Sequence, residues 1–220
     1  MNMESFKGKM VALFDLDGVV FNTEPQYTVF WSEQGRRYHP EISDFGQIIK
    51  GQTLVQIFDK WFNGQDEVQK RITAELDQFE GEMAYEYVPG VEAFLECLRS
   101  FGIPTAVVTS SNAVKMANVY REHPEFKAYF TKILTSEFFK RSKPDPDCYL
   151  LGANMFGVTP AQCVVFEDSF NGIQAGRSAG MTVVGLSTTN PADKIQSYCQ
   201  LVIPDFTGFS VEKMSELLCQ

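Results

Sequence analysis

The chain has 220 residues, which leaves room for one large domain or two small ones. Hydrophobic residues make up 44% of the sequence and charged residues 21%, a balance typical of folded globular proteins and too apolar for a disordered chain. The formal net charge of −9 disfavours nucleic acid and anionic membranes as partners, and no apolar run is long enough for a transmembrane helix. We therefore expect a globular, monomeric protein that binds neither nucleic acid nor a membrane.

The cysteine and histidine counts narrow the chemistry further. The five cysteines are odd in number and form no C-x-x-C pair, and the first residues lack the pattern of a signal peptide. These features predict reduced thiols and a cytoplasmic location. His39 and His123 are the two histidines of the chain, and both precede a proline, so we interpret them as solvated loop residues. A zinc site built on several histidines, or a Ser-His-Asp triad, is therefore not expected.

Short apolar segments recur along the chain and predict buried strands. Helical patterns lie between them, such as Val91, Phe94, Leu95 and Leu98 before a stop at Gly102. Strands that alternate with helices predict an α/β fold with a Rossmann-like parallel sheet, covered by helices on both faces. The predicted strands are residues 10–14, 104–108, 132–135, 163–166, 182–186 and 201–203.

The alternation breaks between residues 22 and 87, where apolar residues follow helical spacing and no strand pattern occurs. We interpret this segment as a small helical cap domain, inserted after the first strand, whose aromatic residues form its own core. Pro89 and Gly90 mark the return to the main domain. The predicted organisation is an α/β core from residues 1–21 and 88–220 and a cap from residues 22–87, with hinges at the two connections.

Polar side chains follow several of the predicted strands. In an open parallel sheet, ligands bind beyond the carboxyl ends of the strands, so these side chains converge on one candidate site. They are Asp15 and Asp17, Thr109, Ser110 and Ser111, Glu167 and Asp168, and Lys143 in the loop after the strand at 132–135.

Four carboxylates and one lysine in a small cleft leave an excess of negative charge. A hard divalent cation relieves this excess, and carboxylate oxygens are ligands that suit Mg²⁺. Thr109, Ser110 and Lys143 form a separate set of donors. Donors placed opposite a metal are what a transferring phosphoryl group needs, because its oxygens carry the charge.

Asp15 and Asp17 are two residues apart, so in continued strand geometry both side chains point to the same side. Asp15 could then attack phosphorus and form an aspartyl-phosphate. Asp17 would protonate the leaving alcohol and later deprotonate the water that cleaves the intermediate.

These motifs resemble the haloacid dehalogenase superfamily over nearly the whole chain. Residues 15–20 resemble its first motif, Thr109 the second, Lys143 the third and the pair Glu167 and Asp168 the fourth. Residues 164–176 are similar to the β-phosphoglucomutase-like and sugar-phosphatase branch, and the helical insert resembles the cap of that branch.

The resemblance implies a catalytic set of Asp15, Asp17, Thr109 and Lys143. It implies that Mg²⁺ binds the carboxylates of Asp15 and Asp168 and the backbone carbonyl of Asp17, with Glu167 as a direct or water-mediated ligand. It further implies a substrate-specificity loop in the cap at Lys50, Gly51, Gln52 and Thr53. The predicted substrate-binding set is this loop together with Thr109, Ser110, Ser111, Asn112 and Lys143.

Several activities remain as alternatives within and outside this superfamily. Its dehalogenases lack the second acidic residue of the first motif, whereas Asp17 is present here. Its phosphonatases use a cap lysine, but the loop at Lys50 is more similar to that of phosphatases and mutases. A response-regulator receiver also carries acidic, hydroxyl and lysine residues at strand ends, but it is about half this length and has no insert. A catalytically silent binding protein on the same fold is a further alternative.

Phosphatase and mutase are the closest alternatives. Tyr27 stands where β-phosphoglucomutases have a histidine, and Leu54 stands where they have an arginine for the second phosphate. Both departures favour a Mg²⁺-dependent phosphatase that acts on a small phosphorylated metabolite, expected to be a sugar phosphate. β-Phosphoglucomutase activity is the alternative, since Arg36 and Arg37 lie elsewhere in the cap and could bind the second phosphate.

Overall fold

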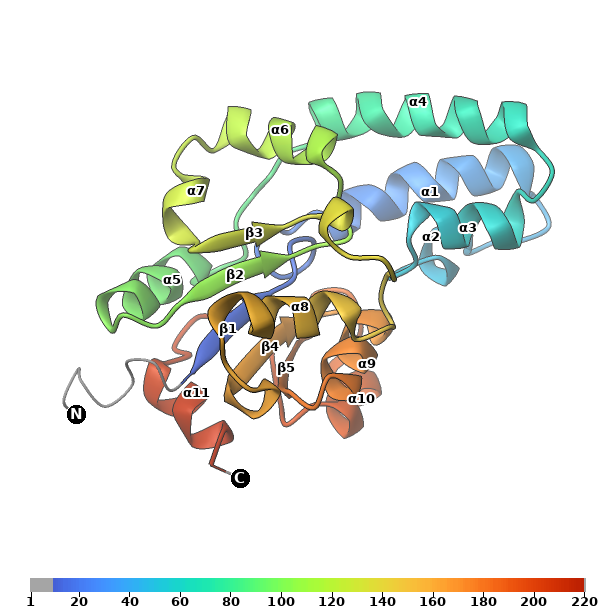
Figure 1. Cartoon of the computed structure of the whole chain (residues 1–220). Helices are drawn as coiled ribbons and strands as arrows, with labels where there is room; N and C mark the ends of the chain where they lie inside the picture. Colours follow the sequence, from blue (N-terminus) through green and yellow to red (C-terminus); the bar gives the residue numbers. More distant parts are fainter. Residues whose placement is uncertain (1–9, 220) are drawn as a thin grey trace.

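The computed structural model of the chain describes residues 10–219 and has a six-stranded sheet at its centre (Figure 1). All neighbouring strands are parallel, in the order β3-β2-β1-β4-β5-β6. The predicted α/β fold is therefore confirmed, and observed strands match predicted ones to within one residue at each end. The strands are β1 (Val11–Phe14), β2 (Thr105–Val108), β3 (Lys132–Leu134), β4 (Cys163–Glu167), β5 (Thr182–Leu186) and β6 (Leu201–Ile203).

Strand side chains alternate between the two faces of the sheet. Because apolar side chains point to both faces, helices cover each of them. Ala12 and Phe14 pack in one apolar core with α5 (Val91–Ser100), α6 (Ala113–Glu122), α7 (Phe126–Tyr129) and α11 (Val211–Leu217). Val11 and Leu13 pack in a second core with α8 (Asp147–Phe156), α9 (Phe170–Ser178) and α10 (Ala192–Ile195). Short 3₁₀ helices lie at Ser136–Phe138, Pro160–Gln162 and Gln196–Tyr198.

Small side chains let α9 lie close to the sheet. A Cβ atom on Gly176 would come within 2.9 Å of Val183 Cγ2 in β5 and 3.2 Å of Val165 Cγ1 in β4. Contacts this short require a shift of packed side chains, so glycine suits the position. The contact packs the last turns of α9 against β4 and β5, so the helix that follows Asp168 and Ser169 lies close along the sheet.

The segment between β1 and α5 is helical, as predicted. It contains α1 (Glu24–Tyr38), α2 (Phe45–Ile48), α3 (Leu54–Trp61) and α4 (Asp66–Glu82), which lie beyond the carboxyl ends of the strands (Figure 1). A third core within this segment includes Phe30, Trp31, Phe45, Phe62 and Ile72. The aromatic residues thus form a core, as the sequence predicts.

The two connections between this segment and the sheet run side by side. Phe21 and Tyr87 form an antiparallel bridge, and the Asn22 amide donates to the Glu86 carbonyl at 2.8 Å. The division into a core and a hinged cap stays a prediction, and residues 1–9 of the predicted core lie outside the described residues. In residues 10–219, the helices are all too short or too polar to cross a membrane.

The interpretation of both histidines as solvated is wrong. His39 Nε2 contacts the Trp61 carbonyl at 2.9 Å, and His123 Nε2 contacts the Tyr85 carbonyl at 2.7 Å. Their side chains are only 16% and 19% exposed, because each ring packs against aromatic neighbours after the end of its helix. Neither histidine lines the cavity described below.

Candidate active site

The polar side chains that follow the strands line one cavity of about 240 Å³, which lies between the sheet and helices α1, α3 and α4. Asp15 follows β1, Thr109 follows β2 and Asp168 follows β4, so three adjacent strands supply its floor. Lys143 reaches the same place from the loop after β3. Every predicted site residue lines the cavity except Glu167, which lies beneath the floor and is fully buried.

Lys143 connects the two layers of this floor. Its ammonium donates to Asp15 Oδ1 and to Glu167 Oε1, each at 2.6 Å, and to the Val108 carbonyl at 3.0 Å. Burial alone would lower the pKa of Lys143, but the two carboxylates outweigh burial and hold this pKa well above its ordinary value. Lys143 is therefore a fixed positive charge beside Asp15.

Glu167 is held from several directions and supports the floor. Its Oε1 also accepts from the Tyr149 hydroxyl at 2.8 Å, and its Oε2 accepts from the amides of Asp168 and Ser169 at 3.1 and 3.3 Å. Gly172 leaves the space for this carboxylate, since a Cβ atom there would lie 1.7 Å from Glu167 Oε1. The glycine at this position is therefore required by the close approach of the glutamate.

Asp168 is buried beside Glu167. The Thr189 hydroxyl donates to its Oδ2, and the Asn190 amide donates to its backbone carbonyl at 2.9 Å. Burial, together with repulsion from Glu167, Glu24 and Asp15, raises the pKa of Asp168 well above its ordinary value. Thr189 and Asn190 were missed in the sequence, although they follow β5 and fit the same rule of strand ends.

The arrangement of acidic groups fits a divalent metal ion. Asp15, Glu167 and Asp168 each offer a carboxylate oxygen, and these oxygens lie within 4.8 Å of one another. Burial is the main reason that the pKa of Asp15 rises to about 7; Lys143 opposes the rise, whereas Glu167 and Asp17 add to it. Oxygen ligands that repel one another in this way suit a hard cation such as Mg²⁺. The residues present therefore fit the predicted ion.

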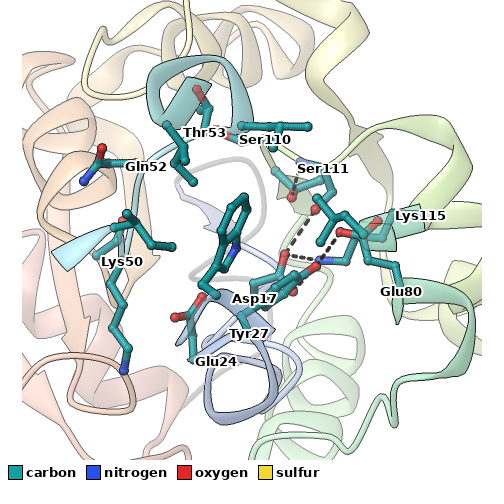
Figure 2. Close-up of a pocket in the computed structure, with 18 of the residues that line it drawn as sticks. Asp17, Glu24, Tyr27, Lys50, Gln52, Thr53, Glu80, Ser110, Ser111 and Lys115 are labelled. Carbon is teal, nitrogen blue, oxygen red and sulfur yellow. Dashed lines mark hydrogen bonds and ion pairs between the residues drawn. The ribbon is translucent and has the colours of Figure 1, made fainter. Parts of the chain in front are cut away.

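Asp17 is bound by a lysine that the sequence analysis missed. The Lys115 ammonium in α6 pairs with both carboxylate oxygens of Asp17, and the Ser111 hydroxyl donates to the same carboxylate at 3.1 Å (Figure 2). The Thr23 hydroxyl also donates to this carboxylate, at 2.6 Å. Burial would raise the pKa of Asp17, but Lys115 and these hydrogen bonds lower it below its ordinary value.

The second lysine and further carboxylates change the charge count made from the sequence. Lys50 and the carboxylates of Glu24, Asp77 and Glu80 also line the cavity. With Glu167 beneath the floor, the described residues place seven carboxylates against three lysines, so the predicted excess of negative charge remains. Lys115 lies in a helix rather than at a strand end, and its side chain is 3% exposed. A buried lysine in a helix has no sequence signal that separates it from a surface lysine.

The segment after β2 combines the predicted donors with a helix start. The Thr109 hydroxyl accepts from the Ser111 amide at 3.0 Å, and the Asn112 side chain caps α6 by accepting from the Lys115 amide at 2.9 Å. Ser110 lines the cavity beside them. The cap at Asn112 thereby fixes the first turn of α6, which carries Lys115.

The predicted specificity loop closes the cavity from the opposite side. Lys50, Gly51, Gln52 and Thr53 all line it, and Thr53 caps α3 in a capping box. Two hydrogen bonds join this region to the core: Asn171 donates to the Gly51 carbonyl at 2.6 Å, and Gln56 donates to the Lys143 carbonyl at 3.2 Å. The loop therefore contacts α9, and the start of α3 contacts the loop that carries Lys143.

The remaining wall comes from α1 and α4. Tyr27 of α1 donates its hydroxyl to Glu80 Oε1 of α4 at 2.7 Å, and Lys115 lies over the Tyr27 ring at 4.8 Å from its centroid. Glu24 also lines the cavity, and burial raises its pKa to about 7. Glu80 was not predicted as a site residue, because the hydrophobic periodicity of α4 identifies only the apolar face of that helix.

Comparisons with known proteins agree with this geometry. A family model described as haloacid dehalogenase-like hydrolase matches residues 9–180. Hexitol phosphatase A of Escherichia coli is 34% identical over 186 residues, which cover 82% of this chain and 83% of that protein. The solved structure of a family IA, variant 3 hydrolase from Entamoeba histolytica has a TM-score of 0.84 at 25% identity, over 96% of this chain and 100% of that one. A β-phosphoglucomutase from Clostridium difficile has a TM-score of 0.78 at 23% identity, over 95% and 96%, which shows the shared fold.

The chain therefore belongs to the haloacid dehalogenase-like hydrolases, as the motifs predict. Its relatives in this family include proteins named as hexitol, fructose-1-phosphate and phosphorylated-carbohydrate phosphatases, which support a phosphoric monoester hydrolase. The roles of the individual site residues stay predictions.

Proposed function

We propose that the protein is a Mg²⁺-dependent phosphatase that hydrolyses a sugar phosphate through an aspartyl-phosphate at Asp15. The observation that carries this proposal is the separate pairing of two neighbouring carboxylates on one cavity wall. Lys143 holds Asp15 and Lys115 holds Asp17, so the two groups have different environments and different pKa directions. Two carboxylates in different environments are the usual arrangement for two different roles in one reaction.

Asp15 is the proposed nucleophile. Its carboxylate oxygen forms a bond to phosphorus while the bond from phosphorus to the leaving alcohol oxygen breaks. The carboxylates of Asp15 and Asp168 and the backbone carbonyl of Asp17 would hold Mg²⁺, with Glu167 as a direct or water-mediated ligand. The ion supplies positive charge for the phosphoryl oxygens when bound. Lys143 and the Thr109–Ser110 segment contribute the donors for the same oxygens.

Asp17 is the proposed acid and base. It gives a proton to the leaving oxygen and then takes a proton from the water whose oxygen replaces Asp15 on phosphorus, which yields phosphate, the Asp15 carboxylate and Asp17 in its initial protonated form. The lowered pKa of Asp17 suits the base role in the described conformation. The acid role requires a protonated carboxyl group, which a looser contact with Lys115 favours.

The mutase alternative is disfavoured by the charges of the cavity. A mutase must bind a second phosphate, which is best done by a fixed arginine. Among the described residues, Lys50 is the one cation that α1 to α4 and their connections contribute to the cavity lining. Arg36 and Arg37 do not line the cavity. Arg37 instead donates to Glu75 at 2.8 Å on the exposed surface.

The substrate proposal is tested with a panel of phosphate esters, pyrophosphate and both glucose phosphates. We expect release of phosphate with Mg²⁺, none with EDTA, and none from the Asp15→Asn variant, whose circular dichroism should match that of the wild type. Equal activity with EDTA would refute the metal role, and full activity of Asp15→Asn would refute the aspartyl-phosphate.

A second assay separates hydrolysis from mutase action. With β-glucose 1-phosphate as substrate, we expect free phosphate to form faster than glucose 6-phosphate. Rapid conversion to glucose 6-phosphate, stimulated by glucose 1,6-bisphosphate and with little free phosphate, would instead establish the mutase activity.

A further inference from the structure

The end of the cavity away from the strand ends combines an apolar wall with acidic side chains. Trp31 of α1, Ile57 of α3 and Leu76 of α4 are all buried and line it. This is the end that faces the leaving alcohol when a phosphoryl group lies against Asp15 and Lys143. An apolar wall suits the C–H face of a carbohydrate-like group, with polar contacts left to a few placed side chains.

The charges at this end are mostly negative. Glu24, Asp77 and Glu80 line the cavity, and Lys50 is the one cation that the described residues of the helical segment add to it. Lys50 and Glu80 lie on opposite sides of the cavity, and the Lys50 side chain extends away from Glu80 (Figure 2). Lys115 of α6 also acts on Glu80, but its ammonium is already paired with both carboxylate oxygens of Asp17. A second anionic group on a substrate would therefore meet Glu80 without an unpaired cation from the helical segment beside it.

Glu80 stands out among these acidic residues because it is buried. It is only 9% exposed, and its Oε1 accepts from the Tyr27 hydroxyl at 2.7 Å. Within residues 10–219, no hydrogen bond or ion pair is present at Glu80 Oε2, which leaves one acceptor for a ligand. Burial is the main cause that raises the pKa of Glu80, and Lys115 and Tyr27 oppose it. An acceptor in this position satisfies a ligand that donates, such as a hydroxyl group.

We infer that Glu80 determines specificity at the leaving-group end, by accepting a hydrogen bond from a substrate hydroxyl and by repelling a second negative charge. The substrate class is then a phosphate monoester of an uncharged polyhydroxy alcohol. Phosphorylated sugar acids and bisphosphates are excluded, because a carboxylate or phosphate next to Glu80 brings two like charges together in a partly dry cavity. This inference rests on the proposed function and adds the chemistry of the alcohol to it.

The test uses pairs of esters that differ in one group. Glucitol 6-phosphate and 6-phosphogluconate differ by the replacement of a hydroxymethyl group with a carboxylate, and glycerol 3-phosphate and 3-phosphoglycerate differ in the same way. Binding to the Asp15→Asn variant with Mg²⁺ is measured by calorimetry, which needs no turnover, and kcat/KM is measured with the wild type. We expect the uncharged member of each pair to be preferred by at least about tenfold, because juxtaposed like charges are strongly unfavourable.

Glu80→Gln and Glu82→Gln form the matched variants. Glutamine at position 80 keeps the shape and an acceptor for Tyr27 but removes the charge, so we expect the preference to fall by about tenfold through tighter binding of the anionic member. Glu82 lies in the same helix, is exposed and does not line the cavity, so Glu82→Gln should keep the wild-type preference. Circular dichroism and thermal unfolding check that both variants fold.

The outcomes separate this inference from the proposed function. Equal affinity for both members of each pair, an unchanged preference in Glu80→Gln, or no binding of either member would overturn the role of Glu80, whatever the enzyme hydrolyses. A clear preference in binding with no release of phosphate by the wild type would instead support Glu80 and contradict the proposed hydrolysis.

Discussion

Replacement of Lys115 by methionine removes the charge that holds Asp17 and keeps most of the apolar stem. The Lys115 ammonium contacts both oxygens of the carboxylate, and the two side chains are 3% and 18% exposed. Loss of one partner from a buried ion pair costs about 3–5 kcal/mol, because the other charge remains buried without compensation. Asp17 keeps its hydrogen bonds from Thr23 and Ser111, so we expect a loss at the lower end, about 3 kcal/mol.

Thermal unfolding measures this loss. For a protein of this size, about 3 kcal/mol lowers Tm by roughly 6–12 °C. Lys213→Met is the matched control, because Lys213 is exposed in α11, and its Tm should equal that of the wild type. A drop below about 2 °C in Lys115→Met would show that the ion pair contributes little to stability.

The effect of Lys115→Met depends on pH in a definite direction. Because the pKa of Asp17 is lowered in the folded protein, the ion pair stabilises the fold above the unfolded pKa of about 4 and stops doing so as the pH falls through the folded pKa. The difference in Tm between wild type and variant should therefore be largest near neutral pH and shrink below about pH 4. A difference that stays constant down to about pH 3 would contradict this assignment of the charge.

A double-mutant cycle tests whether Lys115 also acts on catalysis through Asp17. We expect Lys115→Met and Asp17→Asn each to lower kcat by roughly 10²-fold or more, the scale of general acid–base catalysis. The double variant should be no slower than Asp17→Asn alone, because both changes disable the same carboxylate. Additive losses, or a Lys115→Met variant with wild-type kcat, would refute this reasoning.

Three further predictions follow from the floor of the site. Gly172→Ala should lower both Tm and turnover, because the new Cβ atom displaces Glu167; Gly81→Ala, with no atom within 4 Å of the new Cβ, should instead raise Tm slightly. Asp168→Asn should raise Tm in EDTA, because it removes one of three repelling carboxylates, and should abolish the rise in Tm that Mg²⁺ causes in the wild type. Because the pKa of Asp15 is raised to about 7, the metal-free protein should lose stability as the pH rises from about 4 to about 7. Mg²⁺ should therefore raise Tm more at about pH 8 than at about pH 5. Equal rises of Tm at both pH values would contradict this prediction.

The carboxyl ends of the strands were predictable because they are local features. The apolar run at β1 ends at Asp15, and the run at β4 ends beside Asp168, so periodicity alone located both. The rule that ligands bind at this edge then grouped them before any contact was known. The same rule also predicts Thr189 after β5 as a site residue, although the rule was not used for that strand.

Contacts between elements that are distant in sequence were not predictable in this way. Lys115 and Asp17 are separated by 98 residues, and Glu80 and Tyr27 by 53, so no local pattern relates them. Their positions depend on how α4 and α6 pack against α1 and β1. Glu167 illustrates the same limit. The sequence places Glu167 at a strand end, but it does not show whether this side chain lines the cavity or lies beneath the cavity floor, as it does.

The sequence by itself determined the α/β class, the helical insert after β1 and the group of residues at the strand ends, because hydrophobic periodicity and strand-end chemistry are written in short segments. Tertiary structure decided which charge faces which. It paired Asp15 with Lys143 and Asp17 with Lys115, and it turned Glu80 of an amphipathic helix toward the cavity. The physical reason is that an ion pair or a buried acceptor is defined by distance and exclusion of water, and both arise only when separate elements pack together.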